Sequence, residues 1–297
     1  QSPASRYELN EPVSRLDKET LVVPWLGKAA KSEMVKVACG ALGEGTNPTP
    51  GSFEQIFQCD PSAEYHGFSC WDDFFTRTFR PDVRPVSAPE DDNVIVNACE
   101  SAPLQVKKGV SRSDQFWLKG QPYSLDNMLD FDDLAPRFEG GTVYQAFLSA
   151  LSYHRWHSPV SGTIRKVRVV NGTYYLENQF EGFVDPQGAD PSAPNNSQPF
   201  LTSVATRALI FIEADNPKIG LMCVVPVGMA EVSSCDVTVR AGDRVKKGDP
   251  LGMFHFGGST HCLVFRPGVK LEFEFYGQTP SLDAGNMRLN TAIARVR

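Results

Sequence analysis

The chain has 297 residues, of which 41% are hydrophobic and 22% are charged, and its 29 basic and 35 acidic residues leave a net charge of −6. This composition is typical of a globular protein that buries a sufficient core without metal or disulfide staples. The acidic balance excludes a dedicated nucleic-acid binder, because phosphate contacts need a basic face.

We predict a helical N-terminal segment over residues 1–85. Apolar residues within Glu19–Ala38 recur close to helical spacing, with Pro24 near the first turn. The stretch Trp71–Arg80 places its aromatic side chains on one helical face, and Ser69 is the expected N-cap. Several prolines follow this stretch, and they end the helical segment.

Residues 86–297 are predicted to form a second, mostly β domain. Its short β-type runs are separated by Gly, Pro and Asn, as in a compact β body. One helix is expected around Ser124–Leu129, and Asp185–Pro199 is predicted to be a long loop rich in Pro, Asn and Ser. The fold class predicted for the whole chain is therefore α+β. The predicted strands are Val94–Val96, Ile164–Val170, Leu209–Ile212, Leu221–Val227 and Leu271–Phe275.

Two segments of the β domain echo one another. Ser161–Val167 and Ala241–Gly252 resemble the two halves of a lipoyl- or biotinyl-type barrel-sandwich. Gly248 and Asp249 supply the tight turn of the second half, where glycine relaxes the steric limit on φ. We therefore predict a barrel-sandwich-hybrid-like core. The chain lacks a modifiable lysine of the Met-Lys-Met type at such a turn, which argues against a carrier function.

Two further segments contain residues suited to chemistry. The run Tyr153–Pro159 holds His154 and His157, two of the five histidines in the chain. In the second segment, a Gly-Gly pair that ends at Gly258 comes directly before Ser259. A serine in that position can attack the preceding carbonyl and move the acyl group from nitrogen to oxygen, and a nearby histidine would act as its base.

Each of these signals also has an ordinary structural explanation. The Gly-Gly-Ser-Thr segment could be a turn between strands, and the two histidines could be half-buried residues bonded to backbone carbonyls. A His-x-x-His metal site lacks an evident third ligand, so we expect no metal. A serine hydrolase would carry Gly-x-Ser-x-Gly, and the second glycine is missing after Ser259.

The region from about Trp71 to the C-terminus resembles the phosphatidylserine decarboxylase family, whose members cut their own chain to make a pyruvoyl group. Five ordered blocks over some two hundred residues make this resemblance specific. Asn97–Ser101 and Leu251–Ser259 are most similar to the soluble fungal branch, which includes tryptophan decarboxylases. The five blocks are Asp73–Arg80 with Arg84-Pro85, Leu118–Leu125, Tyr153–Pro159, Val227–Val232 and Phe254–Thr260.

The resemblance implies a role for each matching residue. Ser259 matches the serine that becomes the pyruvoyl group, and Gly258 matches the residue whose carbonyl is attacked. His157 matches the base of self-processing, and His154 matches a residue of the decarboxylation step. The family's third processing residue is an aspartate, and Glu100 stands in its place here, one methylene longer. Another carboxylate could orient His157 instead.

The same resemblance implies the maturation and the cofactor. Attack by Ser259 on Gly258 gives an ester, and elimination then leaves a dehydroalanine that hydrolyses to a pyruvoyl group and ammonia. The products are a large chain, 1–258, and a small chain, 259–297, which stays bound by sheet pairing. The pyruvoyl carbonyl accepts electrons as CO2 leaves, so no pyridoxal phosphate is expected.

The expected substrate is a free L-amino acid, aromatic by resemblance, with L-tryptophan giving tryptamine. No apolar run reaches the roughly 20 residues of a membrane span, and no polybasic patch is present, so we expect no membrane partner. Phe254, His255 and Phe256 lie beside the cofactor position, where they either line the substrate pocket or fill the core.

Seven scattered cysteines without a Cys-x-x-Cys spacing favour free thiols and a cytoplasmic location. The sequence is compatible with a homo-oligomer. Two other functions stay open. One is a phosphatidylserine decarboxylase without its membrane region. The other is a non-catalytic relative that keeps the β domain as a binding module, an alternative supported only by the Glu100 departure.

Overall fold

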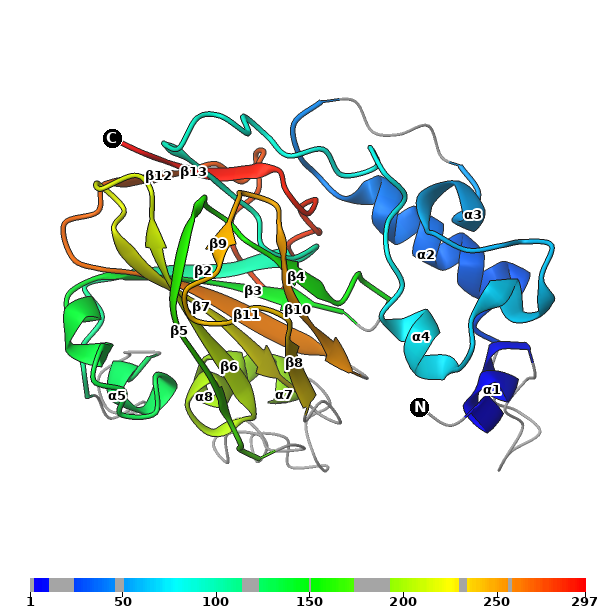
Figure 1. Ribbon diagram of the computed structural model, residues 1–297, viewed down its shortest axis with the longest axis horizontal. Coiled ribbons are helices and arrows are strands. Elements are labelled where there is room, and N and C mark those ends of the chain that lie inside the picture. Colours follow the sequence, from blue (N-terminus) through cyan, green and yellow to red (C-terminus); the bar gives the residue numbers. More distant parts are fainter. Residues whose placement is uncertain are drawn as a thin grey trace.

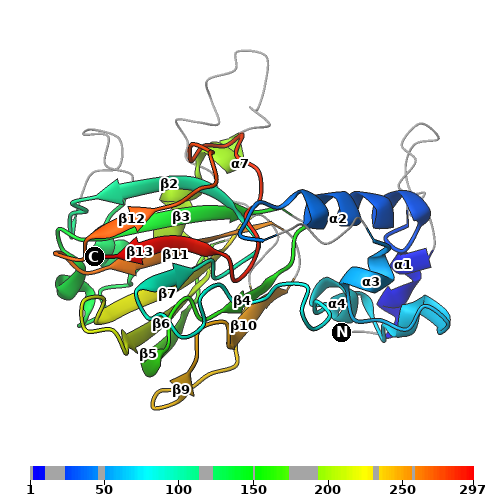
Figure 2. The same cartoon turned by 90° about the horizontal axis from the view of Figure 1, so that it is seen from above.

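The computed structural model describes residues 3–10, 24–45, 51–113, 123–149, 151–173, 193–229, 234–255 and 258–297. The N-terminal helices gather at one end of the molecule and the strands form the rest (Figures 1 and 2). A core of their own joins these helices, with Met34, Phe53 and Phe74 at its centre. The helices are η1 (Pro3–Arg6), α1 (Tyr7–Asn10), α2 (Lys28–Gly40), α3 (Phe53–Ile56), η2 (Glu64–Gly67) and α4 (Trp71–Phe75).

Two of the predicted helix boundaries are wrong. Residues 24–27 form a turn closed by the Gly27 N–H and the Pro24 carbonyl, so helix α2 begins only at Lys28. Helix α4 is shorter than predicted and ends at Phe75, with Cys70 rather than Ser69 as its N-cap. Beyond it, Phe79 pairs with Phe57 in a β-bridge. Residues 11–23 lie outside the described chain.

A seven-stranded antiparallel sheet is the centre of the β domain. Its strand order is β2-β3-β11-β7-β6-β5-β9, so β11 lies inside the sheet and is paired along its whole length on both sides. The strands are β2 (Ala102–Lys108), β3 (Thr142–Leu148), β5 (Gly162–Val170), β6 (Arg207–Ala214), β7 (Leu221–Gly228), β9 (Arg244–Val245) and β11 (Ser259–Phe265).

Each face of this sheet is covered. Two three-stranded sheets pack over one face, around a core that includes Trp156, Leu251 and Phe254. Short helices cover the other face, over Cys262 and Val264. The small sheets are β1 (Val94–Val96), β13 (Ala292–Val296) and β12 (Leu271–Phe273), and β4 (Arg155–His157), β10 (Pro250–His255) and β8 (Ser234–Val237). The short helices are α5 (Leu125–Met128), η3 (Ala135–Phe138), α7 (Ala193–Asn196) and α8 (Gln198–Val204).

The α+β class is confirmed, and the predicted runs at 94–96, 164–170, 209–212, 221–227 and 271–275 all contain strands. The two echoing segments meet through β5 and β9, where Gly162 pairs with Val245. Gly248 forms the expected turn with a φ of +87°. The predicted loop 185–199 is wrong in its last part, because α7 and the start of α8 occupy 193–199, and residues 185–192 lie outside the described chain. The domain boundary at residue 85 and the barrel-sandwich detail stay predictions.

Candidate active site

Ser259 is the first residue of the buried central strand β11. Its register partners are Leu148 on β3 and Gly228 on β7, and the side chain is fully buried. Its Oγ makes no hydrogen bond within the described residues. Gly258 before it is half-buried, and a Cβ there would meet only the Leu148 carbonyl at 4.0 Å. The Gly258–Ser259 peptide therefore lies at the edge of the core, with a hydroxyl that the protein leaves unused.

His154 lies next to the end of β10, the strand that leads toward Ser259. Its carbonyl accepts a hydrogen bond from the Phe254 N–H at 3.0 Å. The ring is fully buried and stacks on Phe75 of α4 at 4.0 Å between centroids. Neither ring nitrogen makes a hydrogen bond of good geometry in the described chain, and the Ser149 backbone interacts with the ring only weakly. Burial, reinforced by the charge of Arg77, lowers the pKa of His154 to about 3, so the ring is neutral at physiological pH.

His157 occupies the other end of this strand pair. The register sets it opposite Pro250, nine residues before Ser259. Its Nδ1–H donates to the Gly248 carbonyl at 2.7 Å, and the Tyr153 hydroxyl donates to Nε2 at 3.2 Å. These partners fix the tautomer, because a carbonyl can only accept. Burial lowers the pKa of His157.

His157 and Tyr153 also line a pocket of about 260 Å³. Ser259 is not among the residues that line this pocket, and its Oγ makes no hydrogen bond to His157. The two residues are thus buried in different surroundings in this form of the chain.

Glu100 is buried in an ion pair with Arg84 rather than beside His157. The Arg84 Nε donates to Glu100 Oε2 at 2.8 Å, its Nη2 donates to Oε1, and the Leu289 N–H donates to Oε2 at 2.8 Å. The structure therefore does not bring Ser259, His157 and Glu100 into hydrogen-bonding contact.

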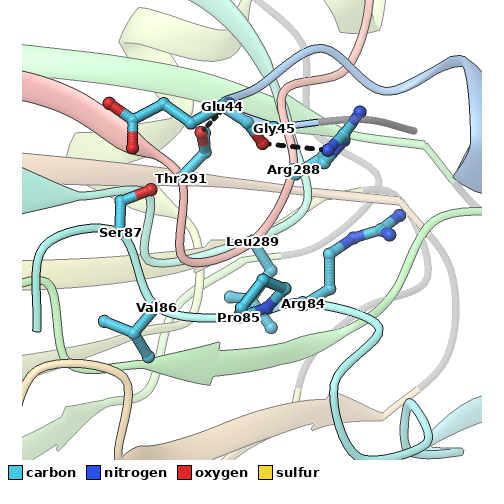
Figure 3. A pocket seen from close by; sticks show the side chains of 9 residues that line it. All are labelled: Glu44, Gly45, Arg84, Pro85, Val86, Ser87, Arg288, Leu289 and Thr291. Carbon is cyan, nitrogen blue, oxygen red and sulfur yellow. Dashed lines mark hydrogen bonds between the residues drawn. The ribbon is translucent and has the colours of Figure 1, made fainter. Parts of the chain in front are cut away.

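A second pocket, of about 230 Å³, lies next to this ion pair. Arg84 and Leu289 line it together with Arg288, Glu44 and Thr291, as Figure 3 shows. Arg288 donates to the Glu44 carbonyl at 3.1 Å, and the Glu44 N–H donates to Thr291 Oγ1 at 2.9 Å. Because both arginines are bound to groups of the protein, the pocket offers little free charge to a ligand.

The three predicted pocket residues have different environments. Phe254 is fully buried and packs against Trp156 with ring centroids 5.0 Å apart, so it belongs to the core. His255 is half-buried on the other side of β10, and its ring Nδ1 lies 2.7 Å from a carboxylate oxygen of Asp72 on α4. Phe256 lies outside the described residues.

Sequence reasoning missed several residues of this region. Asp72 and Phe75 both come from α4, where one bonds His255 and the other stacks on His154. The signal for Phe75 is the block Asp73–Arg80, which identifies the helix but not its contacts, and Asp72 directly precedes that block. His261 on β11 is also fully buried, with both ring nitrogens unpartnered within the described residues. Its signal is a histidine directly before the apolar run of β11, Cys262–Phe265.

The described residues fit a group made from Ser259. The Oγ is buried, unpartnered among the described residues and adjacent to a glycine, and His154, beside the end of β10, is neutral and in an apolar setting. Such a site could host acyl shift and proton transfer away from water. No cluster of three metal-ligating side chains occurs in the part of the chain that the structure describes. Within that part, every helix is too short or too polar to cross a bilayer.

Comparison with known proteins gives one family. The sequence model of phosphatidylserine decarboxylase matches residues 71–286. Decarboxylase iboD of Amanita muscaria is 48% identical over 267 residues, which cover 86% of this chain and 74% of that protein.

Two other relatives are covered less completely. L-tryptophan decarboxylase of Psilocybe cyanescens is 38% identical over 279 residues, 92% of this chain and 60% of that protein. Phosphatidylserine decarboxylase proenzyme 3 of Schizosaccharomyces pombe is 30% identical over 203 residues, 68% of this chain and 19% of that protein. The chain thus spans less than two thirds of either relative.

Proposed function

The chain belongs to the phosphatidylserine decarboxylase family of carboxy-lyases, and we propose that it cleaves itself and decarboxylates a free aromatic L-amino acid, L-tryptophan to tryptamine. The observation that carries this proposal is Ser259. Its buried, unpartnered Oγ follows a glycine at the start of the central strand. A buried hydroxyl without a partner costs free energy, and self-processing gives it a use.

Self-cleavage uses only the chain and water. Ser259 Oγ bonds to the Gly258 carbonyl carbon while the Gly258–Ser259 amide bond breaks, which gives an ester. Loss of the Ser259 α-proton then breaks the Cβ–Oγ bond and releases Gly258 as a carboxylate. Water converts the remaining dehydroalanine into the pyruvoyl group and ammonia. A base must take the hydroxyl proton in the first step and the α-proton in the second.

Two histidines share the proton transfers in this proposal. We assign His157 as the base of self-processing by its place in the family's motif. We assign His154 to the decarboxylation step, and its position beside the end of β10 supports this role. A neutral imidazole holds one N–H proton, which His154 can deliver to the α-carbon of the product.

The pyruvoyl group, once formed, supplies a carbonyl that withdraws electrons from the substrate α-carbon as CO2 leaves. The chain contributes the surroundings. Phe75 covers one face of the His154 ring and keeps water away from it. Asp72 holds His255 on the neighbouring strand end. Helix α4, which lies beside β4 and β10 (Figures 1 and 2), thereby contacts both His154 and His255.

The two product chains are proposed to stay together. The small chain, 259–297, would contain β11, β12 and β13. Strand β11 pairs with β3 and with β7 over seven residues on each side. Strand β13 pairs with β1 of the large chain. Dissociation would open the interior of the main sheet, so the complex should survive cleavage.

A free amino acid is favoured over a phospholipid by the state of the basic residues. In two of the adjacent basic pairs, Arg165-Lys166 and Lys246-Lys247, one lysine is already bound. Lys166 Nζ lies 2.7 Å from Asp132 and 2.6 Å from Asp133. Lys247 Nζ donates to the carbonyls of Ala88 and Asp91. These contacts leave little positive charge for an anionic bilayer. All seven cysteines are free, in accord with the proposed cytoplasmic location.

Denaturing gel electrophoresis with mass spectrometry tests the maturation. We expect the chain of 32.7 kDa to give two fragments, the smaller of 39 residues and about 4 kDa. Ser259→Ala and His157→Ala should remain whole, and Glu100→Gln should mature slowly. The control is Ser158→Ala, another buried serine, whose hydroxyl donates to the Val160 carbonyl at 2.7 Å, and it should mature normally.

Other outcomes would change the assignment. A single intact band after long incubation supports the non-catalytic alternative. If His154→Ala stays whole while His157→Ala is cleaved, the two histidines exchange roles. Unchanged maturation in Glu100→Gln removes Glu100 from the processing machinery.

A substrate panel tests the reaction itself. Cleaved enzyme is mixed with L-tryptophan, L-tyrosine, L-phenylalanine, L-leucine or phosphatidylserine vesicles, and CO2 release is measured. The proposal expects release from L-tryptophan and none from vesicles, with loss of release in His154→Ala. Release from vesicles alone would support the phospholipid alternative.

A further inference from the structure

Ser259 and His261 lie on the same face of β11. Successive side chains of a strand point to opposite faces, so residues two apart share a face about 6.7 Å from each other. Leu263, the next residue on that face, is in the core between the main sheet and the small sheets. Thr260, on the other face, donates to the Ala146 carbonyl and accepts from Gln145. His261 therefore shares the interior layer that contains the proposed cleavage site.

His261 is buried without any hydrogen bond in the described residues. Its exposed fraction is 0%, and neither Nδ1 nor Nε2 has a partner. Burial lowers its pKa to about 3, so the ring stays neutral. A neutral imidazole offers one N–H donor and one bare nitrogen that accepts. Neither the N–H donor nor the bare acceptor nitrogen of His261 is used by the described residues of this layer.

The surroundings of His261 are aromatic, small or apolar. The ring of Tyr144 approaches it edge-on, with centroids 6.0 Å apart, and the Tyr144 hydroxyl is likewise buried and unpartnered among the described residues. Phe273 and Phe275 flank Tyr144 on its other sides. Ala146 is the register partner of His261 on β3 and contributes only a methyl group. Adjacent free donors and acceptors in an aromatic setting are suited to a planar ligand that carries a polar ring atom.

Buried polar groups in folded proteins nearly always have partners, and the opposite face of the same sheet shows this. There, the Tyr123 hydroxyl donates to Gln145 Oε1 at 2.7 Å and accepts from Gln105 at 2.6 Å. By contrast, His261 has no hydrogen-bond partner among the described residues, so both ring nitrogens can bond a ligand.

We propose that His261 is a specificity-determining residue that hydrogen-bonds a polar group on the aromatic ring of the substrate, so that the substrate class is an aromatic amino acid with a ring N–H or O–H. This inference rests on the proposed function and restricts the proposed substrates to aromatic amino acids with a polar hydrogen on the ring. The bare nitrogen of His261 accepts from an indole N–H or a phenol O–H. Phenylalanine has neither group, and it would leave His261 unpaired and desolvated.

The experiment compares L-tryptophan with its benzothiophene analogue, in which sulfur replaces the ring N–H at nearly the same shape. We expect cleaved enzyme to prefer L-tryptophan by at least about tenfold in kcat/KM. His261→Phe should bring this ratio close to one, and His261→Gln should restore part of it. Thr260→Val, a change on the other face of β11, should leave the ratio as it is. Calorimetric binding of tryptamine and of its benzothiophene counterpart should show the same order, independently of turnover.

The possible failures are distinguishable. An equal kcat/KM for the two substrates, or a preference that persists in His261→Phe, overturns the inference while CO2 release leaves the proposed function standing. Absence of CO2 release from every amino acid overturns the proposed function and this inference together. If His261→Phe does not fold or mature, the inference is decided by the kcat/KM ratio of the two substrates, measured on the unmodified enzyme and on His261→Gln.

Discussion

Two sets of polar side chains in the interior differ in whether their hydrogen bonds are satisfied. We call two bonded pairs the paired cluster: Arg84 with Glu100, whose ion pair is complete, and Tyr153 with His157, both of whose ring nitrogens are bonded. The unpaired cluster consists of Ser259, His261, His154 and Tyr144, whose side-chain polar atoms have no hydrogen bond in the described chain. Seven of these eight side chains are buried and His157 is half-buried, so exposure does not explain the difference.

This difference separates residues that stabilise the fold from residues that are expected to bond a ligand. A fully bonded cluster fixes its own geometry and gains little from another molecule. A cluster of buried polar groups without hydrogen bonds lowers the stability of the fold unless a ligand or water supplies the missing partners. Glu100 and Arg84 therefore have a structural explanation, whereas Ser259 and His261 need a functional one. The predictions below measure this difference as stability, and each uses a Ser259→Ala background, in which we expect one uncleaved chain.

The largest expected effect comes from breaking the paired cluster. Glu100→Gln leaves Arg84 buried without its countercharge, and loss of one partner of a buried pair costs about 3–5 kcal/mol. Urea unfolding measures this loss. The control is Asp215→Asn, which breaks the exposed pair with Arg244 and should cost far less, because water already screens it. Equal losses in the two variants would show that the Arg84–Glu100 pair is not structural.

The pH dependence of stability tests whether the unpaired histidines are neutral. His154 and His261 have pKa values of about 3 in the folded chain, against an ordinary value near 6.5 when unfolded. Below pH 6.5 these two histidines bind protons in the unfolded chain but stay unprotonated in the folded chain. Their stabilising effect is therefore complete above pH 6.5 and is lost as the pH falls toward 3.

At pH 5.5 each of the two residues should lower the free energy of unfolding by about 1 kcal/mol relative to pH 7.5. His261→Phe should remove one such contribution from the difference between urea unfolding at the two pH values. A pH dependence that is unchanged in this variant would mean that His261 titrates normally and has a partner.

Strand positions follow from local sequence better than helix ends do. Val94–Val96 is predicted residue for residue, and Leu221–Val227 differs by one residue at its end. Helix α4 ends early because Phe79, which local periodicity assigns to the helix, stacks on Phe57 and Tyr153 instead. A tertiary contact of that kind overrides helical spacing and cannot be read from the segment alone.

In the candidate site, too, local features are predicted from the sequence and tertiary contacts are not. A Gly-Gly-Ser motif is local, so Ser259 is proposed from the sequence alone. The ion pair of Glu100 depends on Arg84, sixteen positions away in the chain, and on the Leu289 backbone, and no sequence spacing predicts that meeting. Alternation along β11 would have set His261 beside Ser259, but only the structure shows that its nitrogens lack partners.

A smaller effect is expected at the pair that joins α4 to β10. Asp72→Asn weakens the contact with His255 and should cost about 1–2 kcal/mol, because the carboxylate is nearly buried and bonds a ring nitrogen. Asp236, on the other side of the same ring at 3.6 Å, is 54% exposed, and Asp236→Asn should cost clearly less. Urea unfolding of the two variants compares them. If both cost the same, the pair does not anchor α4.

The smallest effect separates two tyrosines that are equally buried. The Tyr123 hydroxyl is bonded to Gln145 and Gln105, so Tyr123→Phe removes the short hydrogen bonds of two amide atoms, which keep only a mutual contact at 3.5 Å, and should cost about 1–2 kcal/mol. The Tyr144 hydroxyl has no hydrogen bond among the described residues, so Tyr144→Phe removes an unsatisfied group and should leave the free energy of unfolding unchanged or slightly higher. Urea unfolding of the two variants gives this contrast directly. An equal loss of unfolding free energy in both variants would mean that the Tyr144 hydroxyl has a partner such as bound water. His261 beside it would then no longer be expected to bond a substrate.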